Sequence, residues 1–528
     1  MQSVADAFSV EEVDTARKIA SSIQVAWKKD LRPGASRFTI GVSLIAGGDF
    51  IPGVDGSAVL WNKYQYQDES SRLIDMAYER GLNLPEGGLT KALADFTLDN
   101  TASYYTPGYA GGSSAIFTAV NQPGRPINLA AGFNYNGIDN TVPQFVGLTS
   151  RPPLVDTRSR TAQFQAEDFM GYIQNAYVDK TAMFTTDSTD AILQRALQDL
   201  GYTTAQYDLD PGINIVNFGL FETGQKWGDY VDQLVKAENG HLYQDESGVI
   251  KFDNRQHWSQ FPYFNVQRVI ATSQVINAVL PNADHIINVV EVKASPRILE
   301  SSQRIWELSV GGGSVLLPVG DTEVWASYDD PIFSVTTPVP NGTVGQTSYY
   351  AANLYAVPLP TGGNRTFGVS IKSITNFAQS SKIVFTNNLT YEVYLTVLDI
   401  WGRPARKTGD IYYKEKVDSS ITAYGERPLI IENDYIQNSD WAKSLAGIIL
   451  ADFARPENLQ ELTIRAIPEL QLGDLISWQG RYWRVYDIKT QLSADSGFIQ
   501  ELKLLQRTIR TYFRIGVSLI GGPDVIAP

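Results

Sequence analysis

The chain contains no cysteine among its 528 residues. Disulfide bonds, thiolate metal sites and cysteine nucleophiles are therefore excluded. It also lacks any run of about 18 apolar residues, so we expect no membrane-spanning helix and no stable membrane insertion. The first residues lack a basic segment followed by an apolar one, and we expect no signal peptide.

Positive charge is scarce. Lys and Arg number 43 against 57 Asp and Glu, which gives a formal net charge of −14. Specific binding to nucleic acid needs cationic contacts to phosphate, so this composition disfavours it. Two explanations stay open: the acidic surface simply keeps the protein soluble, or it lines a passage through which DNA slides without sticking.

Recognisable catalytic motifs are also lacking. The three histidines are in neither HxH nor HExxH spacing, and no GxSxG, P-loop or strand-linked GxGxxG pattern occurs. We therefore predict no catalytic residue, no cofactor, no metal site and no enzymatic activity. The histidines are His241, His257 and His285.

A few polar and aromatic pairs are weaker candidates. The acidic pairs Asp208/Asp210, Asp329/Asp330 and Glu11/Glu12 fit solvated turns better than a paired-carboxylate active site. The aromatic pairs Tyr104/Tyr105 and Tyr349/Tyr350 could stack on sugars, but a β-sheet surface is the simpler interpretation.

Glycine, proline and aromatic residues are plentiful, which favours strands and turns. The length suggests three or four domains. Residues 1–160 are predicted to form a mostly β domain, with strands near 126–133 and 143–149 among others.

Residues 161–265 change to an α+β pattern. A helix is predicted over 191–200, between the capping residues of 187–190 and Gly201. A second helix is expected over 225–238, and a β-hairpin follows between about 241 and 252.

The rest of the chain divides into three predicted parts. Residues 266–310 and 396–510 form a second β unit, with one helix at 441–453. Residues 311–395, rich in Gly, Ser, Thr and Pro, form a β-sandwich-like insertion. Residues 511–528 form a C-terminal segment that repeats 38–53.

That repeat is unusual because the six residues 40–45 recur unchanged at 515–520. Two copies do not make a solenoid. Either an old duplication survives, or both copies make the same contact with a neighbouring subunit or partner. The candidate contact residues are Ile40, Val42, Leu44, Ile515, Val517 and Leu519.

Several segments together resemble the minor tail proteins of long-tailed bacteriophages. The first are Leu93–Thr101 (LADFTLDNT), Tyr105–Pro107 (YTP) and Pro123–Ile127 (PGRPI). Further matches follow in the same order, at Ala191–Gly201, Gly240–Tyr243, Ala423–Arg427, Leu472–Ile476 and Tyr482–Val485. Each segment is short, so their order carries the resemblance.

The resemblance implies a tail-tip or baseplate hub, similar to the hub of contractile tails. Such a hub holds two tail-tube-like β-barrels, here separated by the small α+β domain and the β-rich insertion. Three copies would form a ring that joins the tail tube or distal tail ring to a tip fibre or spike. That ring would line the DNA ejection channel of the virion tail, after assembly in the host bacterial cytoplasm.

Two alternatives stay open. The protein could bind a glycan or protein of the host surface through residues 311–395. It could also be a cell-wall hydrolase, although no motif supports that activity.

Overall fold

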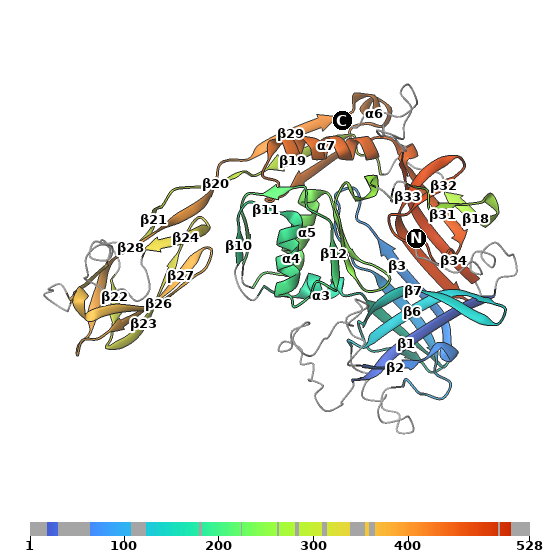
Figure 1. Ribbon diagram of the computed structural model, residues 1–528, viewed down its shortest axis with the longest axis horizontal. Coiled ribbons are helices and arrows are strands. Elements are labelled where there is room, and N and C mark those ends of the chain that lie inside the picture. Colours follow the sequence, from blue (N-terminus) through green and yellow to red (C-terminus); the bar gives the residue numbers. More distant parts are fainter. Residues whose placement is uncertain are drawn as a thin grey trace, which may run out of the picture.

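The computed structural model is mainly β and contains several structural units, as predicted. In Figure 1 a broad body carries an arm that projects from one side. The residues that the structure describes are 18–29, 64–106, 123–178, 182–222, 224–260, 263, 265–279, 285–308, 314–337, 354–357, 365–494 and 497–507.

A large sheet forms much of the body. Its strands lie in the order β18 (Val275–Val279), β31 (Leu459–Arg465), β34 (Gly497–Arg507), β33 (Arg481–Ser493), β3 (Leu73–Gly81), β5 (Leu93–Asp99), β9 (Thr161–Glu167), β7 (Ile138–Thr149), β6 (Pro126–Tyr135), β1 (Ile19–Lys29) and β2 (Tyr64–Asp68). Three short strands pair beside this path: β8 (Leu154–Asp156), β17 (Arg268–Val269) and β32 (Leu475–Trp478).

The two β-rich regions of the sequence meet in this sheet. β3 pairs antiparallel with β33, and Met76 lies opposite Leu492. Alternate residues of β5 are buried, as its apolar–polar alternation predicts. Phe96 of β5 stacks on Phe164 of β9, with ring centroids 5.0 Å apart. The barrel closure that the resemblance implies stays a prediction.

The α+β part lies beside the sheet. Its helices are α3 (Met170–Asn175), α4 (Thr189–Asp199) and α5 (Trp227–Glu238). Its four-stranded sheet has the order β12 (Tyr207–Leu209), β16 (Ile250–Asp253), β15 (His241–Gln244) and β4 (Gly88–Leu89). Two small pairs complete it: β10 (Ala182–Phe184) with β14 (Gly219–Phe221), and β11 (Asp187–Ser188) with β13 (Ile215–Val216).

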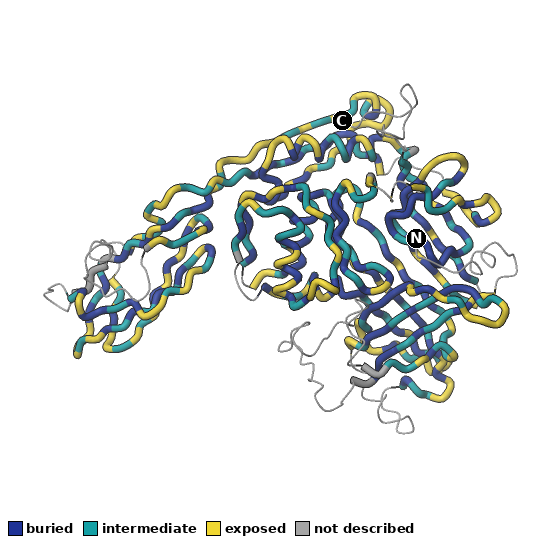
Figure 2. The backbone as a smooth tube through the Cα atoms, in the orientation of Figure 1, coloured by how far each residue is buried: buried dark blue, intermediate teal, exposed yellow. Residues whose placement is uncertain are grey.

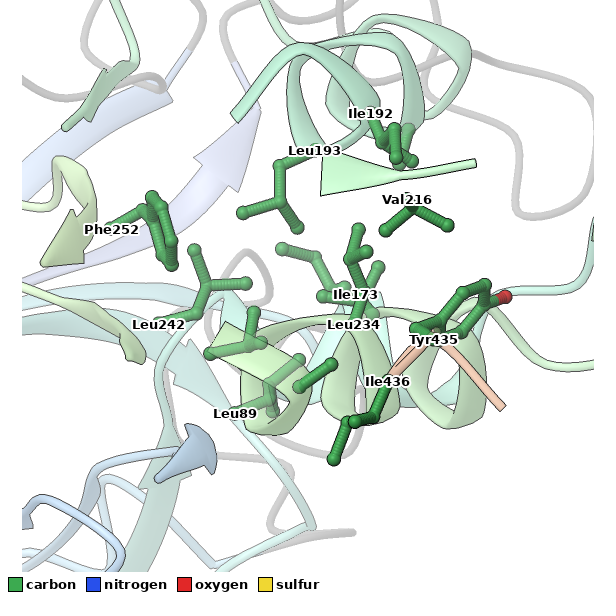
Figure 3. Packing of buried hydrophobic residues seen from close by; sticks show 14 of the residues in the cluster. Leu89, Ile173, Ile192, Leu193, Val216, Leu234, Leu242, Phe252, Tyr435 and Ile436 are labelled. Carbon is green, nitrogen blue, oxygen red and sulfur yellow. The ribbon is translucent and has the colours of Figure 1, made fainter. Parts of the chain in front are cut away.

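Both predicted helices of this part are confirmed, and so is the hairpin. α5 ends where Asn239 adopts the left-handed conformation (φ 54°), which asparagine tolerates. Apolar side chains from α4, α5, the hairpin and a distant segment around Tyr435 pack into one core (Figure 3).

The predicted helix at 441–453 is α7 (Ser439–Phe453). The Asn438 side chain accepts hydrogen bonds from the Asp440 and Trp441 backbone nitrogens, which caps its first turn. α7 packs on a three-stranded sheet of β29 (Ile411–Lys416), β19 (Val289–Ala294) and β30 (Pro428–Glu432), near the short α6 (Asp418–Tyr424). The Trp441 indole donates to the Ala237 carbonyl (2.6 Å), which ties α7 to α5.

The arm is built on β28 (Val393–Lys407), and Figure 2 shows buried residues inside it as well as in the body. Its cluster of buried apolar residues is separate from those of the body. The strands that pair with β28 are β20 (Arg297–Leu299), β21 (Gln303–Glu307), β22 (Val315–Leu317), β24 (Ile332–Thr337) and β25 (Leu354–Val357). A second small sheet has the order β23 (Gly320–Ser327), β27 (Ser380–Asn387) and β26 (Val369–Asn376).

The domain boundaries drawn from the sequence stay predictions. The arm's strands run from Arg297 to Lys407 and so extend beyond 311–395 on both sides. Among the described residues, the helices are too short or too polar to cross a membrane.

Candidate functional site

Two of the segments that resemble tail proteins, at 93–101 and 105–106, lie close to one buried carboxylate. Asn100, just after β5, accepts a hydrogen bond from the Tyr105 backbone nitrogen (2.8 Å) and donates one to the Thr106 hydroxyl (2.9 Å). These bonds fold the loop so that the Tyr105 side chain is fully buried. Asn100 of the TLDN motif therefore fixes the loop conformation through its hydrogen bonds to Tyr105 and Thr106.

Glu69 is the carboxylate that receives this loop, and it is 1% exposed. It accepts hydrogen bonds from the Trp27 indole (2.8 Å), the Tyr105 hydroxyl (2.6 Å) and Arg72 (2.9 Å). Burial, together with the neighbouring carboxylate, raises the pKa of Tyr105 and keeps it a donor. Glu69 thus joins β1, the loop after β5 and the 3₁₀ turn η1 (Ser70–Arg72).

The PGRP motif makes the turn that leads into β6. Gly124 adopts φ +80°, a conformation that glycine allows without strain. Gly124 donates to the Thr149 carbonyl (2.6 Å), and the Arg125 backbone nitrogen donates to the Thr149 hydroxyl (2.9 Å). Pro126 then begins β6 opposite Leu148, as the sequence predicted for a strand start.

A second buried ionic contact joins the large sheet to the α+β part. Arg80 of β3 forms a salt bridge with Glu246, in the turn between β15 and β16, and both are less than 5% exposed. Gln471 also donates to Glu246 (3.0 Å). Sequence reasoning missed this contact. Arg80 lies on the same face of β3 as the buried Met76 and Tyr78. The two-residue period of the strand therefore indicated that Arg80 is buried, although not its partner.

Asp168 is a third buried carboxylate, between β9 and α3. It accepts hydrogen bonds from the backbone nitrogens of Ala92 (2.8 Å) and Met170 (3.1 Å). Burial raises its pKa to about 7, although these bonds oppose the shift.

The structure also brings together Asp210, Asp253 and His257, which the sequence did not associate. β12 and β16 are parallel and pair Leu209 with Phe252, so Asp210 and Asp253 follow side by side. His257 opens the 3₁₀ turn η2 (His257–Ser259). The donor atoms of the three side chains lie within 4.8 Å of one another, close enough to hold a metal ion.

Hydrogen bonds fix this cluster, which we call the Asp–Asp–His cluster. His257 Nδ1 lies 2.6 Å from Asp210 Oδ2 and 3.6 Å from Asp253 Oδ1. The Tyr243 hydroxyl donates to Asp253 Oδ2 (2.9 Å), and the Asn254 backbone nitrogen donates to Asp210 Oδ2 (3.1 Å).

Burial and neighbouring charges shift the pKa values of Asp253 and His257 in the cluster. Burial raises the pKa of Asp253 to about 6, against the opposing charge of His257. Burial alone would lower the pKa of His257. The hydrogen bond to Asp210 and the charges of both aspartates nevertheless raise it.

His241 begins β15 and is buried there. Its ring stacks on Trp258 with centroids 5.2 Å apart, and burial lowers its pKa to about 3. Of the acidic candidates that the structure describes, Asp210 joins the Asp–Asp–His cluster and Asp208 binds Lys251 (2.6 Å). Asp330 binds Arg406 (3.2 Å) at the arm surface.

Of the two aromatic candidate pairs, the structure describes Tyr104 and Tyr105. Tyr105 is buried and Tyr104 lies under the Arg72 guanidinium, so this pair offers no open stacking surface. The arm instead exposes Trp325 (54%), whose ring stacks on Phe377. The pair Tyr349/Tyr350, the pair Glu11/Glu12 and the six candidate contact residues of the repeat lie outside the described residues.

Comparison with known proteins gives structural similarities alone, since no family model and no curated protein matches the chain. The 43 kDa tail protein of prophage MuSo2 from Shewanella oneidensis has 9% identity and a TM-score of 0.44, with 92% of this chain and 98% of that one covered. A tail protein from Neisseria meningitidis MC58 has 10% identity and a TM-score of 0.44, with coverage of 92% and 96%.

Prophage tail protein gp18 from Listeria monocytogenes EGD-e has 8% identity and a TM-score of 0.39, with coverage of 85% and 92%. All three of these solved structures are tail proteins.

Proposed function

We propose that this chain is a structural hub of a bacteriophage tail tip and has no enzymatic role. The ordered tail-protein segments carry the proposal, and four of them form or lead into strands of one continuous sheet. LADFTLD forms β5 and PGRP opens β6, while the Leu472–Ile476 segment leads into β32 and YWRV lies in β33. β3 alone separates β5 from β33 in this sheet.

In this proposal three copies form a ring that joins the tail tube or distal tail ring to a tip fibre or spike. Such a ring needs strand edges that can meet. Within the described residues, β18 and β2 lie at the two ends of the large sheet. β18 exposes Ile276 (57%) and Val279 (48%). An edge strand with unpaired backbone groups and exposed apolar side chains is suited to pairing with a neighbouring copy.

The ring would also line the DNA ejection channel in the virion. The net charge of −14 supports this role, because an acidic lumen limits adhesion of DNA phosphates. DNA would pass through without specific binding.

The double variant Ile276→Lys/Val279→Lys tests the edge contact. Analytical ultracentrifugation of the purified wild-type chain at high concentration should give a trimer, and the double variant should shift it to monomer, because charged edges resist pairing. Val319→Lys, at a 60% exposed arm position, is the control and should remain trimeric. A double variant that trimerises like wild type would contradict the edge contact.

A second candidate function is host-surface binding through the arm. The arm stands away from the body (Figure 1) and exposes the Trp325 ring, and aromatic faces bind sugars by stacking. A glycan array with the full chain should then give binding that Trp325→Ala abolishes and Val319→Ala preserves. No binding to the array or to host wall extract would eliminate this function.

A further inference from the structure

We propose that the Asp–Asp–His cluster binds one divalent transition-metal ion, with Zn²⁺ or Mn²⁺ as the matching chemistry. This inference is independent of the hub proposal. The ligands would be Asp210, Asp253 and His257, which the parallel strand ends and η2 bring together.

The spacing of the donor atoms fits a single ion. Donors that each lie about 2.0–2.2 Å from Zn²⁺ in a tetrahedral site are roughly 3.3–3.6 Å apart. His257 Nδ1 lies 3.6 Å from Asp253 Oδ1, close to that spacing, and its 2.6 Å hydrogen bond to Asp210 Oδ2 is the contact that an ion would open.

The donor set selects the type of ion. Two carboxylates and one imidazole mix oxygen and nitrogen ligands, which suits Zn²⁺ or Mn²⁺ better than the all-oxygen sites of Ca²⁺ and Mg²⁺. An ion bound at His257 Nδ1 would replace the proton that the ring shares with Asp210.

The carboxylate of Asp253 is buried and held in position, as a metal ligand would be. Its side chain is only 5% exposed, yet Oδ1 lies 3.6 Å from His257 Nδ1, beyond hydrogen-bond distance. Its other oxygen is held by the Tyr243 hydroxyl, and Asp210 is held by the Asn254 backbone nitrogen. Metal-binding carboxylates in proteins have such outer supports.

Access to the cluster is also available. The side chains of Asp210 and His257 are 26% and 14% exposed, so an ion can enter and keep a water ligand. Trp258 and Tyr263 contact the His257 ring, and Arg484 of β33 donates to the carbonyls of both (2.9 and 2.8 Å). A bound ion would therefore stabilise the junction between the α+β part and the large sheet.

Isothermal titration of the full chain, freed of metal by chelator, tests the proposal with ZnCl₂ and separately with MnCl₂. We expect one ion per chain for at least one of them and a higher thermal unfolding temperature when it is bound. Asp210→Asn and His257→Gln should each weaken binding by at least about tenfold.

Asp208→Asn is the matched control. Asp208 lies two residues away with its side chain 70% exposed, binds Lys251, and is not in the cluster, so affinity should not change. Asp210 is the most exposed of the three ligands, so Asp210→Asn should remain folded even where a His257 variant unfolds. Circular dichroism checks that each variant is folded. Absence of stoichiometric binding of both ions, or equal affinity in wild type and Asp210→Asn, would overturn the proposal.

Discussion

At the residue scale, buried carboxylates organise this protein, and each has a different set of partners. Glu69 is surrounded by three side-chain donors. Asp168 has backbone donors, and Asp253 has a tyrosine hydroxyl. Because a buried charge is costly unless it is hydrogen-bonded, these partners determine what removal of each carboxylate does.

Glu69→Ala should lower the free energy of unfolding by about 2–4 kcal/mol, because it leaves the Trp27 indole and the Tyr105 hydroxyl without an acceptor. Urea unfolding measures the loss. Glu432→Gln, which removes a 61% exposed partner of Lys293, is the control and should cost under about 1 kcal/mol. Equal effects of the two substitutions would contradict the structural role of Glu69.

The raised pKa of Asp168 predicts that the free energy of unfolding depends on pH. Its folded pKa of about 7 lies above the ordinary 3.8, so the folded state favours the protonated acid. The protonated Asp168 therefore contributes most to the free energy of unfolding below about pH 4, and this contribution is lost as the pH rises toward 7. Asp168→Asn does not titrate, so the stability of wild type relative to this variant should fall between pH 4 and 7. Parallel stability curves over that range would rule out the raised pKa.

At the element scale, the Arg80–Glu246 salt bridge joins β3 to the β15–β16 hairpin. Glu246→Ala should destabilise the protein by about 3–5 kcal/mol, because it leaves Arg80 buried without its partner. Adding Arg80→Ala to this variant should restore part of the loss, and a double-mutant cycle measures the coupling. Strictly additive single effects would show that the contact contributes nothing.

The elements themselves differ in how far the sequence predicted them. α4, α5, α7 and the hairpin were predictable because apolar periodicity and turn residues are local, although only α7 of these helices has a side-chain N-cap bond. The pairing of β3 with β33 could not be predicted. The alternation of apolar and polar residues shows which face of a strand is buried, but not which strand lies beside it. For the same reason Asp210 and His257, 47 residues apart, were not associated before the fold placed them together.

On the scale of the whole molecule, the arm forms a unit with its own apolar core. Its two connecting strands run together where the Glu300 backbone nitrogen donates to the Pro404 carbonyl (3.0 Å). Replacing residues 302–402 with a short Gly-Ser linker should therefore leave the body folded. Thermal unfolding should change by only a few degrees, and the oligomeric state should not change. Loss of trimers on this deletion would mean that the arm takes part in assembly.

The central claim, a threefold hub at the tail tip, is tested most directly by electron microscopy of the parent tails with antibody bound to this chain. The account predicts label at the distal end of the tube only, on a ring with three copies around the tail axis. Label along the shaft or at the head, or a ring without threefold symmetry, would contradict it.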